Sequence, residues 1–124
     1  AGVGKRRSGM LSVTTSVAIF VHTEPADLRK GFDGLAGIVR GQFGGDPLDG
    51  SLYLFFNRRR DRLKILHFDG TGFWLYYKLL EAGTFEPLAS RERRVQIDSA
   101  QLAMLLGGIS LVGVQRRKRY RRAS

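Results

Sequence analysis

The sequence contains no cysteine and only two histidines, His22 and His67, among its 124 residues. Without thiols it can form no disulfide, thiolate zinc site or iron–sulfur cluster, and it has no cysteine nucleophile. Two histidines are too few for a histidine-rich metal site, and we expect neither a metal nor another cofactor. The lack of cysteine also favours a reducing, intracellular environment.

Long hydrophobic runs are missing as well. No apolar stretch approaches the roughly 18 residues that a membrane span requires, so we expect no membrane association. The N-terminal RRSGML is similar to part of a twin-arginine signal, but the apolar VAIFV after it is too short and no small-residue cleavage site follows. These absences predict a cytoplasmic protein, with association with the nucleoid as an open alternative.

The positive charge is concentrated at the two ends of the chain. The formal net charge is +10, from 21 basic and 11 acidic residues. Three of the basic residues precede Met10 and six lie in QRRKRYRRAS at 115–124, which leaves 12 basic against 11 acidic residues between them. Basic ends on a nearly neutral body favour a polyanionic partner, most often nucleic acid, over a tail that only improves solubility.

The hydrophobic pattern predicts a small α+β protein with one domain at 11–114, an N-terminal extension at 1–10 that we expect to be flexible, and the basic tail at 115–124. Stretches rich in β-branched and aromatic residues predict strands at 17–22, 51–56, 62–68 and 73–80. The last three are closely spaced, and DGTG at 69–72 is a hairpin signal, so we expect an antiparallel meander. The segment 83–94 is expected to be irregular, with a short extended piece near Phe85.

Two helices are predicted to pack on this sheet, at 25–41 and 97–109. Pro25 suits the first position of the earlier helix, because its missing N–H has no partner there. An apolar stripe at helical spacing is expected to face the core: Leu28, Phe32, Leu35 and Val39. Three glycines interrupt this helix at a cost of about 1 kcal/mol each, which we explain by tight packing on the sheet. Asp98 and Gln101 form a capping box for the later helix, and Gly107-Gly108 ends it.

Catalytic motifs are not supported. AGVGKRRS ends in Gly-Lys like a phosphate-binding loop, but it lacks the first glycine, the Ser or Thr after the lysine, and a preceding strand. The aspartates that suggest a metal-dependent nuclease are mostly explained by turns, and two histidines give no Ser–His–Asp arrangement. We therefore expect no catalytic, metal-binding or cofactor-binding residues and no enzymatic activity.

A dense cationic cluster occurs in NRRRDRLK at 57–64, between two predicted strands. We predict that it contacts phosphates or guanine edges together with the tail. The predicted contact residues are Arg58, Arg59, Arg60, Arg62, Lys64, Arg116, Arg117, Lys118, Arg119, Arg121 and Arg122. The aromatics Trp74, Tyr76 and Tyr77 add base stacking if they are exposed. The alternative is a solvated turn whose charges prevent edge-to-edge aggregation.

Three blocks give the sequence a family resemblance: PADLRKGFDGLAGIV, DPLDGSLYLFFNRRRDRLKILHFDGTGFWLYYKLLEAGTF and IDSAQLAMLLGGISLVGVQRRKRY. In this order they closely resemble the TnpB-type accessory protein of bacterial insertion sequences of the IS66 family, over about 11–122. The resemblance implies a protein needed for efficient transposition beside a separate, larger DDE-type transposase. It implies no catalytic residues.

Two functional classes follow from these observations. The first is a nucleic-acid-binding accessory factor, with DNA and the element-encoded transposase as partners. The second is a protein–protein adaptor that contacts the transposase with little direct DNA binding. The basic ends favour the first class, whereas the nearly neutral, aromatic-rich body also allows the second. Neither class fixes an oligomeric state.

Overall fold

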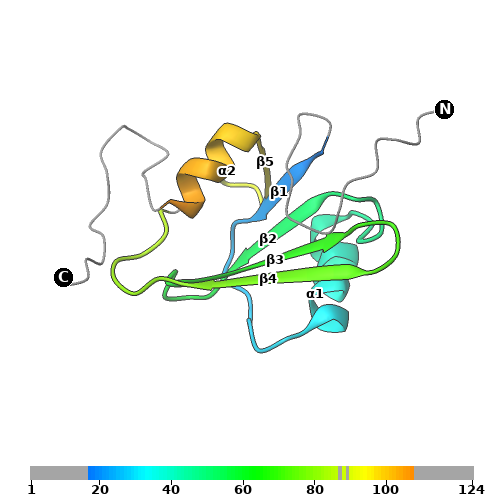
Figure 1. The fold of residues 1–124 in the computed structure, drawn as a ribbon, viewed down its shortest axis with the longest axis horizontal. Helices are drawn as coiled ribbons and strands as arrows, with labels where there is room; N and C mark the ends of the chain where they lie inside the picture. Colours follow the sequence, from blue (N-terminus) through cyan, green and yellow to red (C-terminus); the bar gives the residue numbers. More distant parts are fainter. Residues whose placement is uncertain (1–16, 87, 89, 108–124) are drawn as a thin grey trace.

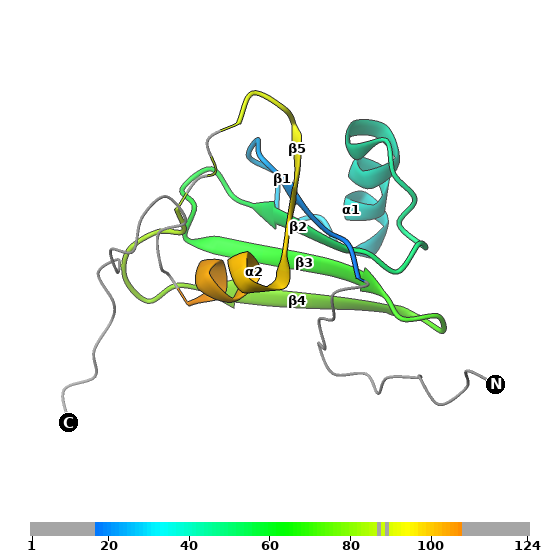
Figure 2. The same ribbon diagram turned by 90° about the horizontal axis from the view of Figure 1, so that it is seen from above.

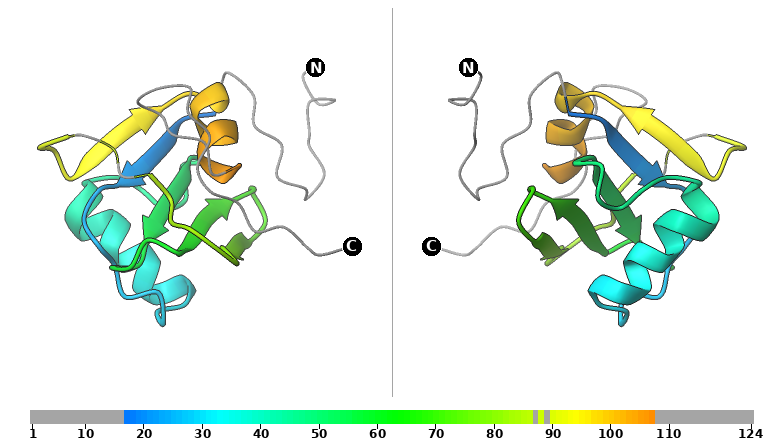
Figure 3. Two further views of the ribbon diagram at one scale, coloured as in Figure 1. Left: turned by 90° about the vertical axis from the view of Figure 1, so that its left-hand side faces the viewer. Right: turned by 90° about the vertical axis from the view of Figure 1, so that its right-hand side faces the viewer.

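A computed structural model describes residues 17–86, 88 and 90–107, and these form a five-stranded sheet with a helix on each face (Figures 1 and 3). The strands are β1 (Ile19–His22), β2 (Leu52–Phe56), β3 (Arg62–Phe68), β4 (Phe73–Leu79) and β5 (Arg94–Ile97), in the spatial order β4-β3-β2-β1-β5. The predicted α+β class is confirmed. The proposed extension at 1–10 and basic tail at 115–124 lie outside the described residues.

The predicted meander is confirmed from β2 to β4. β2 pairs antiparallel with β3, placing Leu54 opposite Ile65, and β3 pairs antiparallel with β4, placing Ile65 opposite Tyr76. The turn between β3 and β4 is closed by Asp69, whose Oδ1 accepts the backbone N–H groups of Thr71 and Gly72. Asp is favoured in turns because its side chain can bond the backbone in this way.

The other half of the sheet contains one parallel pair and one strand that was not predicted. β1 runs parallel to β2, and a parallel pair needs a long crossover connection, which the helical segment between them provides. β5 pairs antiparallel with β1 on the opposite edge, with Val21 opposite Val95. The irregular assignment of 83–94 is correct up to Arg93, but Arg94 already belongs to β5.

The first helix begins later than predicted. α1 spans Phe32–Ile38 and continues into a π-helical turn, η2 (Val39–Phe43), which ends at Gly44 with φ 67°. The prediction of a helix from Pro25 is wrong, because the Ala26 N–H bonds to the Phe56 carbonyl at 2.8 Å. This bond ties the chain after Pro25 to the end of β2, and a loop precedes the helix (Figure 1).

The sheet separates two apolar layers. Alternate residues of β2 and β3 point to opposite faces, so Tyr53, Phe55 and Leu66 pack with α1 and η2, whereas Leu54 and Ile65 pack on the side of α2. The predicted stripe of the first helix is correct for Leu35 and Val39, which are fully buried. It is wrong for Phe32, which is 45% exposed.

The second helix, α2 (Ser99–Leu106), has the predicted capping box. The Gln101 N–H donates to Asp98 Oδ1 at 2.8 Å, and the Asp98 N–H donates to the Gln101 side chain at 2.9 Å. The helix starts two residues later than predicted because Ile97 is the last residue of β5. At its other end, Lys78 Nζ of β4 donates to the Leu106 carbonyl at 2.7 Å, which favours a helix C-terminus.

Candidate nucleic-acid interface

The turn between β2 and β3 holds two arginines in solvent. Asn57 organises this turn: its Oδ1 accepts the N–H groups of Asp61 and Arg62, and its Nδ2 donates to Asp61 Oδ1 at 2.7 Å. The Asp61 carboxylate is therefore bonded to an amide and not to a neighbouring arginine. Arg58 and Arg59 occupy the tip and are exposed. Among the described residues neither has a carboxylate partner.

Arg60 differs from its two neighbours because it folds back onto the domain. Its backbone has φ 59°, in the left-handed region that glycine usually fills in such hairpins. Its guanidinium lies 4.5 Å from the centroid of the Phe56 ring, and its carbonyl accepts the Phe85 N–H at 2.7 Å. Burial lowers the pKa of Arg60 from its usual value, against the opposing effect of Glu86. Arg60 thus anchors the turn and is less exposed than Arg58 and Arg59.

The next two cations of the cluster lie on the α1 side of the sheet. Arg62 and Lys64 are two residues apart on β3, a spacing of about 7 Å, and share a face with Tyr77 of β4. Arg62 donates to the Tyr77 hydroxyl at 2.9 Å, and Lys64 Nζ lies 5.3 Å from the centroid of that ring. Lys64 also donates to the Lys30 carbonyl at 3.2 Å, which brings a further exposed lysine beside the cluster.

These contacts bring Arg62, Lys64 and Lys30 together, and the adjoining turn adds the exposed Arg58 and Arg59. We call these five cations the basic ribbon. The hydrogen-bond acceptors of Arg62 and Lys64 are a hydroxyl and a carbonyl, both neutral. Their positive charges are therefore positioned, and no carboxylate of the described residues forms an ion pair with either of them.

The six predicted contact residues of the tail, Arg116, Arg117, Lys118, Arg119, Arg121 and Arg122, lie outside the described residues. The last described residue is Gly107, directly after Leu106, whose carbonyl is bonded to Lys78. Lys78 pairs with Leu63, close to the turn that carries Arg58 and Arg59. Gly107, the last described residue, therefore lies near the turn that joins β2 to β3.

The three candidate stacking aromatics do not form one platform. Trp74 and Tyr76 lie on the α2 side of β4 and stack on each other, with ring centroids 6.0 Å apart and planes at 16°. Tyr77 lies on the opposite side, in contact with Arg62 and Lys64 of the basic ribbon, and is 53% exposed. The Trp74 indole donates to Asp69 Oδ2 at 2.7 Å. This bond and the backbone bonds of the turn hold the pKa of Asp69 well below its usual range.

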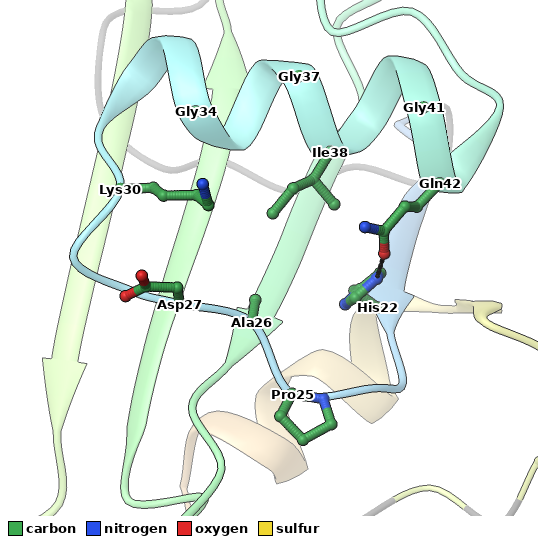
Figure 4. A pocket seen from close by; sticks show the side chains of 10 residues that line it. All are labelled: His22, Pro25, Ala26, Asp27, Lys30, Gly34, Gly37, Ile38, Gly41 and Gln42. Carbon is green, nitrogen blue, oxygen red and sulfur yellow. Dashed lines mark hydrogen bonds between the residues drawn. The ribbon is translucent and has the colours of Figure 1, made fainter.

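A cavity of about 450 Å³ beside the basic ribbon has no counterpart in the sequence predictions (Figure 4). It lies between the loop containing Pro25 and Lys30 and the glycine-bearing side of α1 and η2. His22, which is 2% exposed, closes one end: its Nδ1 donates to the Glu24 carbonyl and its Nε2 lies 2.8 Å from the Gln42 side-chain amide. Lys30, in the loop before α1, lines the opposite end.

The cavity also corrects our explanation of the glycines. Gly34 and Gly37, two of the three glycines explained in that way, line it together with Gly41, so they do not pack tightly on the sheet. A Cβ at Gly37 or Gly41 would meet nothing within 4 Å, and one at Gly34 would lie 2.7 Å from the Lys30 side chain. The spacing of these glycines by three and four residues signalled a shared helix face, but not what that face adjoins.

Most of the aspartates that suggested a nuclease act in turns, whereas Asp33 lies at the start of α1. Asp46 and Asp49 each accept the N–H of the residue two positions later, at 3.0 and 2.8 Å. Asp49 also accepts the Tyr53 hydroxyl at 2.9 Å; burial and this bond raise the pKa of Tyr53 to about 12. Within the described ranges, no cluster of three His, Asp or Glu side chains is placed to hold a metal ion.

None of the helices formed by the described residues is sufficiently long and apolar to cross a membrane.

Comparison with known proteins agrees with the resemblance. The family model described as "IS66 Orf2 like protein" matches residues 17–116. The uncharacterized protein y4jC of Sinorhizobium fredii (strain NBRC 101917 / NGR234) is 30% identical over 108 residues, covering 87% of this chain and 92% of the relative. The uncharacterized protein y4hO of the same strain is 36% identical over 100 residues, covering 81% and 87%. No solved structure gives a significant match.

Proposed function

The chain belongs to the IS66 Orf2-like family, whose members have an accessory role associated with transposition, and we propose that it performs this role by binding duplex DNA. The proposed contacts are the basic ribbon and the basic tail at 115–124, acting beside the element-encoded transposase. We assign no catalytic or cofactor-binding residue.

The observation that carries this proposal is the uncompensated charge of the basic ribbon. Arg62 and Lys64 are held in place by the Tyr77 hydroxyl and the Lys30 carbonyl, so they are positioned but keep their full charge. Arg58 and Arg59 extend the same positive surface to the tip of the hairpin. Such a row of cations suits a phosphate backbone, and an exposed arginine at a hairpin tip also has the donors to contact a guanine edge in the major groove.

The tail is able to reach the same ligand. Between Gly107 and residue 115 an extended chain spans at most about 28 Å. Because Gly107 follows the part of α2 that is bonded to Lys78, this reach includes the tip of the β2–β3 hairpin. We therefore propose one discontinuous phosphate-binding surface made of the basic ribbon and the tail.

The test of the basic ribbon is the double variant Arg58→Ala/Arg59→Ala. Each phosphate contact contributes about −0.9 to the slope of log K against log salt, so losing two contacts flattens the slope by about 1.8. Gel-shift titrations with a duplex at several salt concentrations measure this slope. The matched control is Arg40→Ala/Arg91→Ala, which removes two exposed cations from η2 and from the segment before β5 and should leave the slope unchanged. Equal effects of both variants would show that only net charge matters and would refute the site.

Arg60 gives a separate prediction because it anchors the turn. Replacing it with alanine keeps the strained φ but removes the stacking on Phe56 and the burial of the aliphatic part of the side chain. We therefore expect the free energy of unfolding to fall by about 1 kcal/mol. We expect its effect on the salt slope to be smaller than that of Arg58→Ala alone. Thermal melts and salt titrations of the two single variants check this. A larger slope change for Arg60→Ala would identify Arg60 as a phosphate contact.

The second candidate function is an adaptor that binds the transposase with little direct DNA binding. It is favoured by the nearly neutral body and by exposed large apolar side chains such as Phe32 and Leu48. A pull-down with the cognate transposase, with and without element-end DNA, distinguishes the two. Capture without DNA, together with weak duplex binding that the arginine variants do not change, would support the adaptor and exclude the DNA proposal.

A further inference from the structure

The outer edge of β4 carries backbone groups that no other strand of the described residues pairs with. β4 is the last strand of the sheet, and among the described residues no strand lies on its other side (Figures 1 and 2). Two hydrogen bonds fix which of its backbone groups point outward: the Asp69 N–H bonds to the Gly72 carbonyl, and the Leu80 N–H bonds to the Asp61 carbonyl. Bonded pairs alternate along an antiparallel ladder, so the even-numbered residues of β4 bond to β3. The odd-numbered residues direct their N–H and C=O groups to the free edge: Phe73, Leu75, Tyr77 and Leu79.

Within the part of the chain that the structure describes, this edge lacks the usual protection against pairing. Natural edge strands are kept apart by proline, bulges, short length or outward-reaching lysines. β4 has seven residues, no proline and no bulge in its register with β3. Its one charged residue is Lys78, whose amine is drawn toward α2 by the bond to the Leu106 carbonyl. Trp74, Tyr77 and Leu79 on the same strand are 40%, 53% and 46% exposed.

The residues of β4 are complementary to a second copy of the same strand. An antiparallel pairing that uses all seven residues is centred on Tyr76. It places Leu75 opposite Tyr77 of the second copy and Phe73 opposite Leu79, and these are the residues with outward backbone groups. It places Trp74 opposite Lys78 of the second copy, where the indole can pack on the aliphatic part of the lysine side chain while its amine stays bonded to the Leu106 carbonyl. No two like charges are opposed in this register.

From this complementarity we propose that the chain forms a two-fold symmetric dimer in which β4 pairs with β4 of a second copy, with the axis at Tyr76. The two sheets become one continuous sheet. Residues opposite each other across a sheet share a face, so both α1 helices lie on one side and both α2 helices on the other. The two basic ribbons then face the same way, although the dimer itself does not depend on DNA binding.

The decisive test exchanges charges between positions 74 and 78. Trp74→Lys opposes lysine to Lys78 of the second copy, and symmetry applies the repulsion twice, so we expect the dimer dissociation constant to rise roughly 10- to 30-fold. Adding Lys78→Glu converts both repulsive pairs into ion pairs and should restore dimerisation. Within one chain these positions are about 13 Å apart along the strand, so rescue requires a second chain. Sedimentation equilibrium on the full-length chain measures both constants, and thermal melts verify that each variant is folded.

Hydrogen exchange of the β4 amides identifies what covers the edge. In the proposed dimer, the outward N–H groups of Leu75 and Tyr77 are protected at high protein concentration and lose protection on dilution. A monomer with unprotected amides would overturn the proposal. A monomer whose amides stay protected on dilution would also overturn it, because the edge would then be covered by the chain itself. A dimer that Trp74→Lys leaves intact, or that the double variant does not restore, would place the interface elsewhere.

Discussion

Removal of residues 115–124 is expected to flatten the salt dependence of duplex binding by about 5.4 in the slope of log K against log salt. The tail carries six cations, and each phosphate contact contributes about −0.9. Between 50 and 200 mM salt, the intact protein should therefore lose about a thousandfold more affinity than the truncated one when all six cations contact phosphate. Gel-shift titrations of both proteins at several salt concentrations measure the two slopes.

The control for this deletion keeps the charge and changes the order. A variant with the ten residues of the tail in shuffled order should bind duplex with the slope of the intact protein, because phosphate contacts by lysine and arginine depend on charge more than on sequence. A neutral tail of equal length should behave like the truncation. If the truncated and intact proteins have the same slope, the tail does not contact DNA, and the basic ribbon alone must account for binding.

The two regions of cations also separate affinity from sequence preference. Loss of the tail should weaken binding to every duplex similarly, since phosphate contacts carry no sequence information. Loss of Arg58 and Arg59 should also relax any sequence preference if one of them contacts guanine. Only these two arginines are changed because they are exposed, whereas Arg60 folds inward onto Phe56.

The sequence predicted the parts of the fold that depend on near neighbours. Alternating apolar residues located β2, β3 and β4, and the Asp69 turn joins the last two through bonds that span three residues. The capping box of α2 is equally local, because Asp98 and Gln101 bond each other. In each of these cases the residues that form the feature lie within a short stretch of chain.

The errors arose where a distant partner decides the structure. Pro25 looks like a helix start, but the Ala26 N–H is already bonded to Phe56, 30 residues later in the sequence. β5 has only four residues, and its partner β1 lies more than 70 residues earlier. Neither the length nor the local pattern of 94–97 therefore predicts a strand. The same limit applies to the site: composition found the arginines, but only the position of the Phe56 ring distinguishes Arg60 from Arg58 and Arg59.

The first helical segment offers the largest expected effect on stability, at Phe43. This side chain is 5% exposed and lies between three rings, with centroids 5.3 Å from His22, 5.2 Å from Tyr53 and 5.6 Å from Phe55. Phe43→Ala would leave a cavity at the meeting point of η2 and the sheet, and we expect it to lower the free energy of unfolding by roughly 3–5 kcal/mol. In thermal melts this corresponds to a midpoint about 10–20 °C lower.

Phe32→Ala is the matched comparison, because the helical spacing placed Phe32, and not Phe43, in the predicted core stripe. Its ring is 45% exposed and has a tilted contact with Phe73 at 6.1 Å, so its loss should lower the free energy of unfolding by about 1 kcal/mol or less. Since both changes remove the same group from neighbouring helical segments, the difference in midpoint isolates burial. Equal shifts would mean that Phe43 does not fill the space between η2 and the sheet. A larger shift for Phe32 would restore the helix orientation that the sequence pattern first indicated.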